Sequence, residues 1–177
     1  MVPRVGELRT MGTRKMLIAG SVALVLVGTA TATAQAEDPW TLGPDGYKQL
    51  RLHQPERAAE ATGLLVDKQA DTRCHMFHLR PGEGQTNVGS GVFVDPAQGV
   101  VMIGGTAKSH TPEGVSIGSS LAEVRAAYPA LTTVPPMSWV YHARVAGRPD
   151  ARYRFAFDEN DQIADFALES TKKNACT

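Results

Sequence analysis

The sequence predicts an α+β protein made of two tandem repeats, each a short helix followed by an antiparallel β-meander. Three observations support this prediction. A helix-start signal stands at Ser120 and Glu123, short runs of alternating apolar and polar residues follow it, and a similar order of segments occurs earlier in the chain. We expect the two sheets to join edge to edge, with the helices on one face.

The chain begins with the features of a signal peptide over residues 1–36. A positively charged stretch precedes an apolar run over residues 16–27, and Ala36 ends a small-residue cleavage site. The apolar run is shorter than the roughly 20 residues that a membrane span requires. We therefore expect cleavage near Ala36 and secretion of the remaining chain, with either Met1 or Met11 as the start of translation.

The charge balance argues against nucleic acid or an anionic surface as the partner. The full chain has 18 basic and 18 acidic residues, of which four basic and one acidic lie in the leader. The exported part therefore has 14 basic and 17 acidic residues, a net charge of −3, and it contains no basic run. Its 141 residues are enough for one compact domain or two small modules that share a core.

The first repeat is predicted over residues 47–105, after an N-terminal linker over residues 37–46. Its helix is expected over residues 55–62, with Pro55 at the first helical position and Gly63 after the end. Three strands should follow, over residues 74–79, 92–95 and 100–103.

The second repeat is predicted over residues 106–177, including a C-terminal tail. Ser120 and Glu123 form a capping box ahead of an apolar stripe, and Pro129 ends the helix. A loop over residues 132–136 leads to strands expected over residues 139–145, 153–157 and 163–168. Because these segments follow the same order as those of the first repeat, we interpret the pair as a duplication; the alternative is two unrelated meanders.

Cys74 and Cys176 are the only cysteines of the chain. In an exported protein a single disulfide between them is the expected state. It would tie the C-terminal tail to the first repeat. The alternative, two free thiols or a catalytic cysteine, has no C-x-x-C spacing or neighbouring base to support it.

The lead-in Val115-Ser116-Ile117-Gly118, the short helix after it and the Phe155-Ala156-Phe157-Asp158 turn resemble the helix-plus-sheet module of bacterial envelope proteins. This module occurs singly in small outer-membrane lipoproteins of the barrel-assembly machinery and in tandem in secreted beta-lactamase inhibitory proteins. The tandem form is the closer analogy, over residues 47–170, and it implies that a concave sheet holds a protein partner without catalysis. The chain has Gly118-Ser119-Ser120 where the family has Gly-Met-Ser or Gly-Met-Thr, and it allows one disulfide in total, which argues against inhibition of a beta-lactamase in particular.

No group of residues in the sequence predicts a cofactor, a metal or an enzyme. His75 and His78 are three apart in a predicted strand, so their side chains leave on opposite faces. The alternative function that we keep open is a small secreted hydrolase whose site is assembled from His142, Asp165 or Ser90 by the fold.

The predicted binding surface is the sheet face that points away from the helices. Aromatic residues at alternate positions, Tyr141, Tyr153, Phe155 and Phe157, are expected to pack on the helices together with Met76, Val92 and Val94. The opposite face then gathers arginine, aromatic and methionine side chains, the types enriched at protein interfaces, and includes a positive strip at Arg152 and Arg154. We predict that a protein partner, a secreted enzyme or an envelope component, docks there on Arg73, His75, Phe77, Phe93, Met102, His142, Arg144, Arg152 and Arg154. The alternative is a solvated face with scattered apolar atoms.

Overall fold

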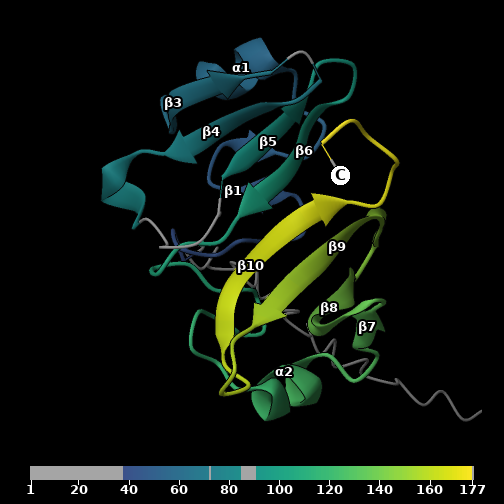
Figure 1. The fold of residues 1–177 in the computed structure, drawn as a ribbon. Coiled ribbons are helices and arrows are strands. Elements are labelled where there is room, and N and C mark those ends of the chain that lie inside the picture. Colours follow the sequence, from purple (N-terminus) through teal and green to yellow (C-terminus); the bar gives the residue numbers. More distant parts are fainter. Residues whose placement is uncertain (1–37, 72, 85–90, 177) are drawn as a thin grey trace, which may run out of the picture. The chain divides into compact units, whose positions relative to one another are not determined.

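The computed structural model describes residues 38–71, 73–84 and 91–176. The predicted signal peptide lies outside these residues. Eight of the strands form one antiparallel sheet, in the spatial order β3 (Leu65–Ala70), β4 (His75–Leu79), β5 (Val92–Asp95), β6 (Gly99–Gly104), β10 (Ile163–Ser170), β9 (Arg148–Phe157), β8 (Met137–Val145) and β7 (Thr132–Val134). The last strand in sequence, β10, therefore lies between β6 and β9 and joins the early strands to the late ones (Figure 1).

The remaining elements of the described chain are short. A two-stranded sheet pairs β1 (Gly46–Tyr47) with β2 (Leu50–Arg51). The helices are α1 (Glu56–Glu60), the 3-10 helix η1 (Pro81–Glu83) and α2 (Leu121–Ala127). None of the helices among the described residues is long and apolar enough to cross a membrane.

The capping box predicted at the start of α2 is present. The hydroxyl of Ser120 accepts a hydrogen bond from the backbone amide of Glu123, and the Glu123 carboxylate accepts one from the Ser120 amide at 2.7 Å. These bonds satisfy two amides that have no partner within the helix. The signal fixed where the helix begins, but the helix is only seven residues long.

The predicted α+β fold of two helix-plus-meander repeats is wrong. The described chain is mostly β, because one continuous eight-stranded sheet runs through it and the two α-helices have only five and seven residues. Two of the strands, β3 and β7, lie where the sequence predicted no strand. The strands that we had matched also differ in length: β5 has four residues, whereas β9 has ten. Each α-helix buries a single residue, so the sheet supplies most of the core.

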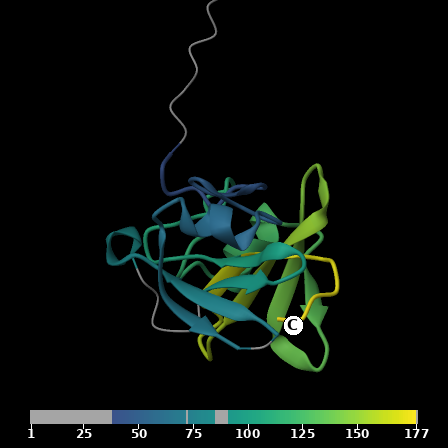
Figure 2. The ribbon, with the colours of Figure 1, turned by 90° about the horizontal axis from the view of Figure 1, so that it is seen from above.

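One face of the sheet carries that core. Directly opposite residues on neighbouring strands point to the same side, so the register defines a row of core side chains. All members of this row are buried: Phe77, Val92, Ile103, Leu168, Tyr153 and Ala143. Ala59 of α1 and Val124 of α2 join the same cluster, as does Leu42, whose carbonyl accepts a hydrogen bond from the Tyr153 hydroxyl at 2.8 Å. The chain around β1 and β2 lies behind the sheet in Figure 1 and at the top of Figure 2, so both views place it on this core side.

The predicted disulfide between Cys74 and Cys176 is present. It fixes a C-terminal tail that crosses the end of the sheet from β10 to the start of β4. On the way, the Thr171 amide donates to the Asp150 carbonyl at 3.0 Å, and the Ala175 amide donates to the Asp95 carboxylate at 2.8 Å. The tail therefore links strands from both halves of the sheet.

Candidate functional site

A row of directly paired residues crosses the face of the sheet opposite to the core, which we call the outer face. The register connects one residue from each of seven strands, β8, β9, β10, β6, β5, β4 and β3. Since opposite residues point the same way, their side chains share this face. With strands about 4.8 Å apart, the row is about 29 Å long. This cross-sheet row consists of Arg144, Arg152, Glu169, Met102, Phe93, Met76 and Gln69.

The cross-sheet row has an apolar half and a charged half. Met102, Phe93 and Met76 lie side by side on β6, β5 and β4, and each is partly exposed. Arg144 is exposed at the other end and forms no hydrogen bond or ion pair within the described part of the chain. Three large apolar side chains in contact with solvent, on the same face as an unpaired guanidinium, are a combination that protein interfaces favour.

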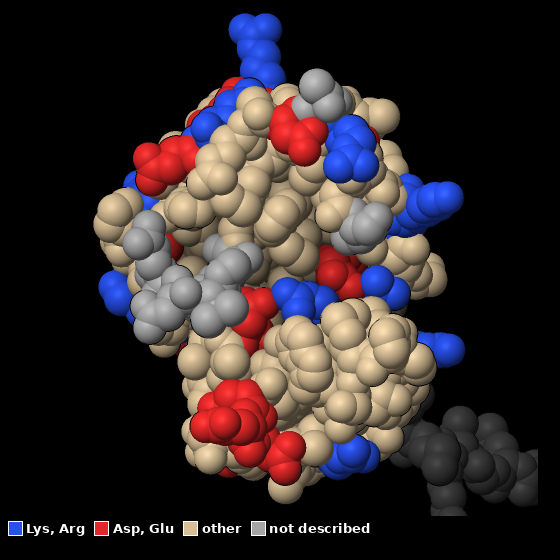
Figure 3. Space-filling model, in the orientation of Figure 1, with Lys and Arg blue, Asp and Glu red and all other residues tan. Residues whose placement is uncertain are grey.

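Between these two ends, Glu169 is the centre of a network of ion pairs. Its side chain is only 5% exposed, and its Oε1 accepts a hydrogen bond from Arg152 Nε at 2.6 Å and lies 3.1 Å from His142 Nε2. Arg154 Nη2 donates to Asp165 Oδ2 at 2.6 Å, and Arg154 Nε lies 3.9 Å from Glu169 Oε2. Basic and acidic side chains accordingly meet in the middle of the face seen in Figure 3. The positive strip predicted at Arg152 and Arg154 is therefore largely neutralised by two buried carboxylates.

The two carboxylates differ in how well they are satisfied. Burial acts to raise the pKa of Glu169, but the hydrogen bond from His142 and the charge of Arg152 outweigh it, so the pKa lies below its ordinary value. For Asp165, burial prevails over the attraction of Arg154 and raises the pKa. The Asp165 Oδ1 atom is buried and has no hydrogen-bond partner among the described residues. Glu169 is thus a well-satisfied anion, whereas Asp165 holds Arg154 through one oxygen only.

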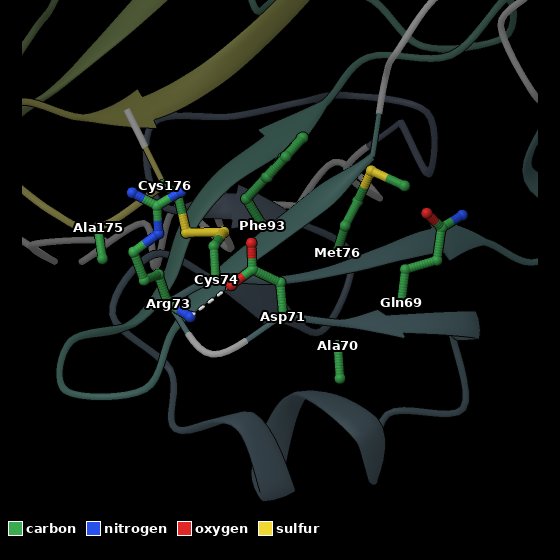
Figure 4. A pocket seen from close by; sticks show the side chains of 9 residues that line it. All are labelled: Gln69, Ala70, Asp71, Arg73, Cys74, Met76, Phe93, Ala175 and Cys176. Atoms are coloured by element: carbon green, nitrogen blue, oxygen red, sulfur yellow. Dashed lines mark hydrogen bonds between the residues drawn. A yellow bond between two sulfur atoms is a disulfide. The ribbon is translucent and has the colours of Figure 1, made fainter.

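A cavity of about 440 Å³ opens at the apolar end of the cross-sheet row (Figure 4). Met76 and Phe93 form one side of it and the disulfide another. Arg73, in the turn between β3 and β4, contributes a guanidinium that forms no ion pair in the described structure. Asp71 also borders the cavity, where its Oδ1 accepts the backbone amide of Arg73 at 2.8 Å. The cavity therefore combines an apolar wall with polar groups at its rim.

The structure brings most of the predicted surface residues together. Arg73 lies beside the outer face, at the cavity. On the face itself lie Phe93, Met102, His142, Arg144, Arg152 and Arg154.

Two predicted surface residues, His75 and Phe77, point to the core side instead. Phe77 is 2% exposed, and His75 Nδ1 lies 2.6 Å from a carboxylate oxygen of Glu56 on α1. Conversely Met76, which we had assigned to the core, lies on the outer face because it is paired with Phe93. A shift of one residue moves every side chain of a strand to the other face, and β4 carries apolar residues on both faces.

Sequence reasoning missed Glu169, which organises the charged half of the site. A signal for it existed: along β10, Phe166 and Leu168 alternate with Asp165, Ala167 and Glu169, so both acidic residues belong on the face of the arginines. That alternation indicates neutralising partners for Arg152 and Arg154.

Two of the three residues of the alternative hydrolase, His142 and Asp165, do not line a common cavity in the described structure. His142 lines a groove of about 650 Å³ between β7, β8 and β9, and Asp165 is not among the residues that line it. The ring of His142 contacts Glu169 and not Asp165. Ser90 lies outside the described residues. No group of three or more His, Cys, Asp or Glu side chains in the described part is arranged to hold a metal ion.

Comparison with known proteins gives little further guidance. No family model matches the sequence, and no curated protein is significantly similar to it. One solved structure, described as that of the uncharacterized protein yfeY from Escherichia coli, is similar with a TM-score of 0.48 and 12% sequence identity, over 73% of this chain and 99% of that one. A similarity at this level identifies neither a family nor an activity.

Proposed function

We propose that this protein is an exported, non-enzymatic binding protein that docks a protein partner on the outer face of its sheet. The observation that carries the proposal is the cross-sheet row, in which Met76, Phe93 and Met102 are partly exposed side by side at one end and Arg144 is unpaired at the other. A binding role is also what the resemblance to tandem inhibitory proteins implies.

Export is part of the same proposal. The leader has the charge and apolar pattern of a signal peptide, and the disulfide supports an oxidising compartment, because such bonds are rare in the cytosol. The mature chain is expected to begin near Glu37.

The outer face is suited to binding because its polar groups are held in place before a partner arrives. Arg152 and Arg154 are fixed by Glu169 and Asp165, so they lose little side-chain freedom on binding. The disulfide holds the rim of the cavity in the same way. A pre-ordered surface of this kind converts more of its contacts into affinity.

Site-specific photo-crosslinking tests the proposal. A photoreactive phenylalanine analogue is placed at Phe93 on the outer face or, as the control, at the exposed Ala58 of α1, and the protein is exposed to the culture fluid of its own source. We expect a discrete crosslinked protein from the Phe93 position and none from Ala58, and its yield should fall in an Arg144→Gln background.

Arg152 and Arg154 are less suitable positions for this test. Removing Arg154 would leave the buried carboxylate of Asp165 without its partner, which costs about 3–5 kcal/mol, and removing Arg152 would take the hydrogen bond at 2.6 Å from the buried Glu169. Either change would confuse loss of binding with loss of folding. Equal labelling from Phe93 and Ala58, or labelling that does not change in the Arg144 variant, would show that the outer face is not the docking surface.

A further inference from the structure

We infer that the segment of the partner that lies on the outer face is acidic, with a large apolar side chain between carboxylates. This inference rests on the proposed function and names the chemistry of the partner. It follows from which charges of the face are already paired and which are not.

Two charged side chains at the outer face, both positive, form no ion pair among the described residues. Glu169 and Asp165 neutralise Arg152 and Arg154, whereas Arg144 and the guanidinium of Arg73 have no ion pair in the described structure. These two free guanidinium groups lie toward opposite ends of the face, Arg144 on β8 and Arg73 at the cavity beside β4.

The tail adds further positive charge along the end of the sheet, from the groove at Arg144 toward the turn between β5 and β6. Thr171 lines the same groove as Arg144, and the exposed Lys172 and Lys173 follow it directly. The protein as a whole is acidic after export, with a net charge of −3, so this basic border is a local feature and favours isolated carboxylates over a polyanion. A guanidinium recognises such a carboxylate with two parallel hydrogen bonds.

The apolar centre of the row sets the other requirement. Phe93 and Met76 form the wall of the open cavity, and methionine adapts its shape to the side chain that enters. From Arg144 to Met76 the row crosses five strand intervals, about 24 Å, which an extended peptide spans with about seven residues. One segment can therefore reach both free arginines while it places an apolar side chain between them.

The probe for this inference is a library of random peptides displayed on phage, selected on the exported chain. Selected peptides are synthesised and titrated by isothermal calorimetry against the parent and the variants Arg144→Gln, Arg73→Gln and Phe93→Ala. Arg57→Gln is the matched control, because Arg57 is an exposed arginine on α1, which packs on the core side.

We expect acidic residues to flank an aromatic or aliphatic residue in the selected peptides. Affinity should fall about tenfold in each of the variants at Arg144 and Arg73, fall with added salt, and stay unchanged in the Arg57 variant. Unchanged thermal unfolding of the variants shows that the loss is not one of folding.

Three other results overturn the inference. Peptides that need Phe93 but are neutral or basic would be consistent with the docking face and would rule out an acidic partner. Peptides that bind independently of both Phe93 and Arg144, or a selection without enrichment, would rule out both the docking face and the acidic partner. Salt-sensitive self-association in sedimentation, lost in the Arg144 variant and not blocked by the peptides, would identify a second copy of the chain as the occupant.

Discussion

Replacing Cys74 and Cys176 together by serine should lower the free energy of unfolding by about 4.7 kcal/mol. The two residues are 102 apart in sequence, so the bond closes most of the chain that the structure describes into one loop. In the chain-entropy model, a loop of this length removes about 16 cal/mol/K from the unfolded state, which corresponds to about 4.7 kcal/mol at 25 °C. The folded state should change little, because the backbone amide of Ala175 still donates to the Asp95 carboxylate and the side-chain amide of Gln98 still donates to the Lys173 carbonyl.

The same value predicts a large thermal shift. An entropy of unfolding of about 2.1 cal/mol/K per residue gives about 0.3 kcal/mol/K for the 141 residues after the predicted leader, so the midpoint should fall by about 16 °C. Circular dichroism melts of the oxidised parent, the reduced parent and the double serine variant measure this shift of the midpoint. The reduced parent and the double serine variant should have the same midpoint, and reductant should leave the midpoint of the variant unchanged.

A small shift would refute this reasoning. If the double variant melted within a few degrees of the oxidised parent, the tail would be held by its contacts in both states and loop entropy would not be the source of stability. A loss well above about 5 kcal/mol would instead show that the tail contacts need the bond to form.

Three further predictions concern the helix, the core and the charged network. Ser120→Ala removes the cap that accepts the amide of Glu123 and should cost about 1 kcal/mol in urea unfolding; an unchanged midpoint would contradict it. Gly105→Ala should cost about 1–3 kcal/mol, because a Cβ there would lie 2.2 Å from the ring of Phe166; thermal melts detect this, and a neutral result would mean that the ring moves freely. The folded pKa of Glu169 lies below its ordinary value, so its contribution to stability is complete above the unfolded pKa and is lost as the pH falls through the folded value. Glu169→Gln should be less stable than the parent at pH 7 and should lose less stability than the parent when the pH falls below the unfolded pKa of a glutamate, about 4.3; parallel stability profiles of the two proteins would argue against this.

The sequence predicted those helices and strands that depend on residues close to one another along the chain. The capping box at Ser120 and the aromatic alternation from Tyr153 to Phe157 depend on neighbours within a few residues, and both elements form, although β9 begins at Arg148, before the predicted strand. β3 and β7 are strands because they pair with β4 and β8, and this pairing has no local signature. The single sheet likewise depends on the pairing of β10 with β6, which brings together residues about 65 positions apart.

The same distinction explains which residues of the outer face could be predicted. Phe93 is flanked by Val92 and Val94, which are both buried, and Met102 is the one residue of β6 that is not buried, so the predicted outward direction of both agrees with the structure. In β4 both sides are apolar, and only the pairing of Phe77 with Val92 decides that Met76 points outward. Charge pairing across three strands is less accessible still, because it needs the register of β8, β9 and β10 together.

The pair of Arg154 and Asp165 tests whether the buried carboxylates serve stability or position. Burial raises the pKa of Asp165, and one of its oxygens has no partner among the described residues, so the ionised group destabilises the fold relative to a neutral one of the same shape. Asp165→Asn should therefore change the free energy of unfolding at pH 7 by less than about 1 kcal/mol, whereas Arg154→Gln should cost about 3 kcal/mol or more because it leaves the carboxylate unpaired.

The variant that carries both substitutions should recover most of that loss in urea unfolding, because no unpaired carboxylate remains at position 165. An Asp165→Asn loss as large as that of Arg154→Gln would show that the ion pair itself stabilises the fold. The predicted asymmetry means that Asp165 positions the guanidinium of Arg154 on the outer face more than it holds the sheet together. On the docking surface that we propose, this arrangement would hold the guanidinium of Arg154 in place before a partner arrives.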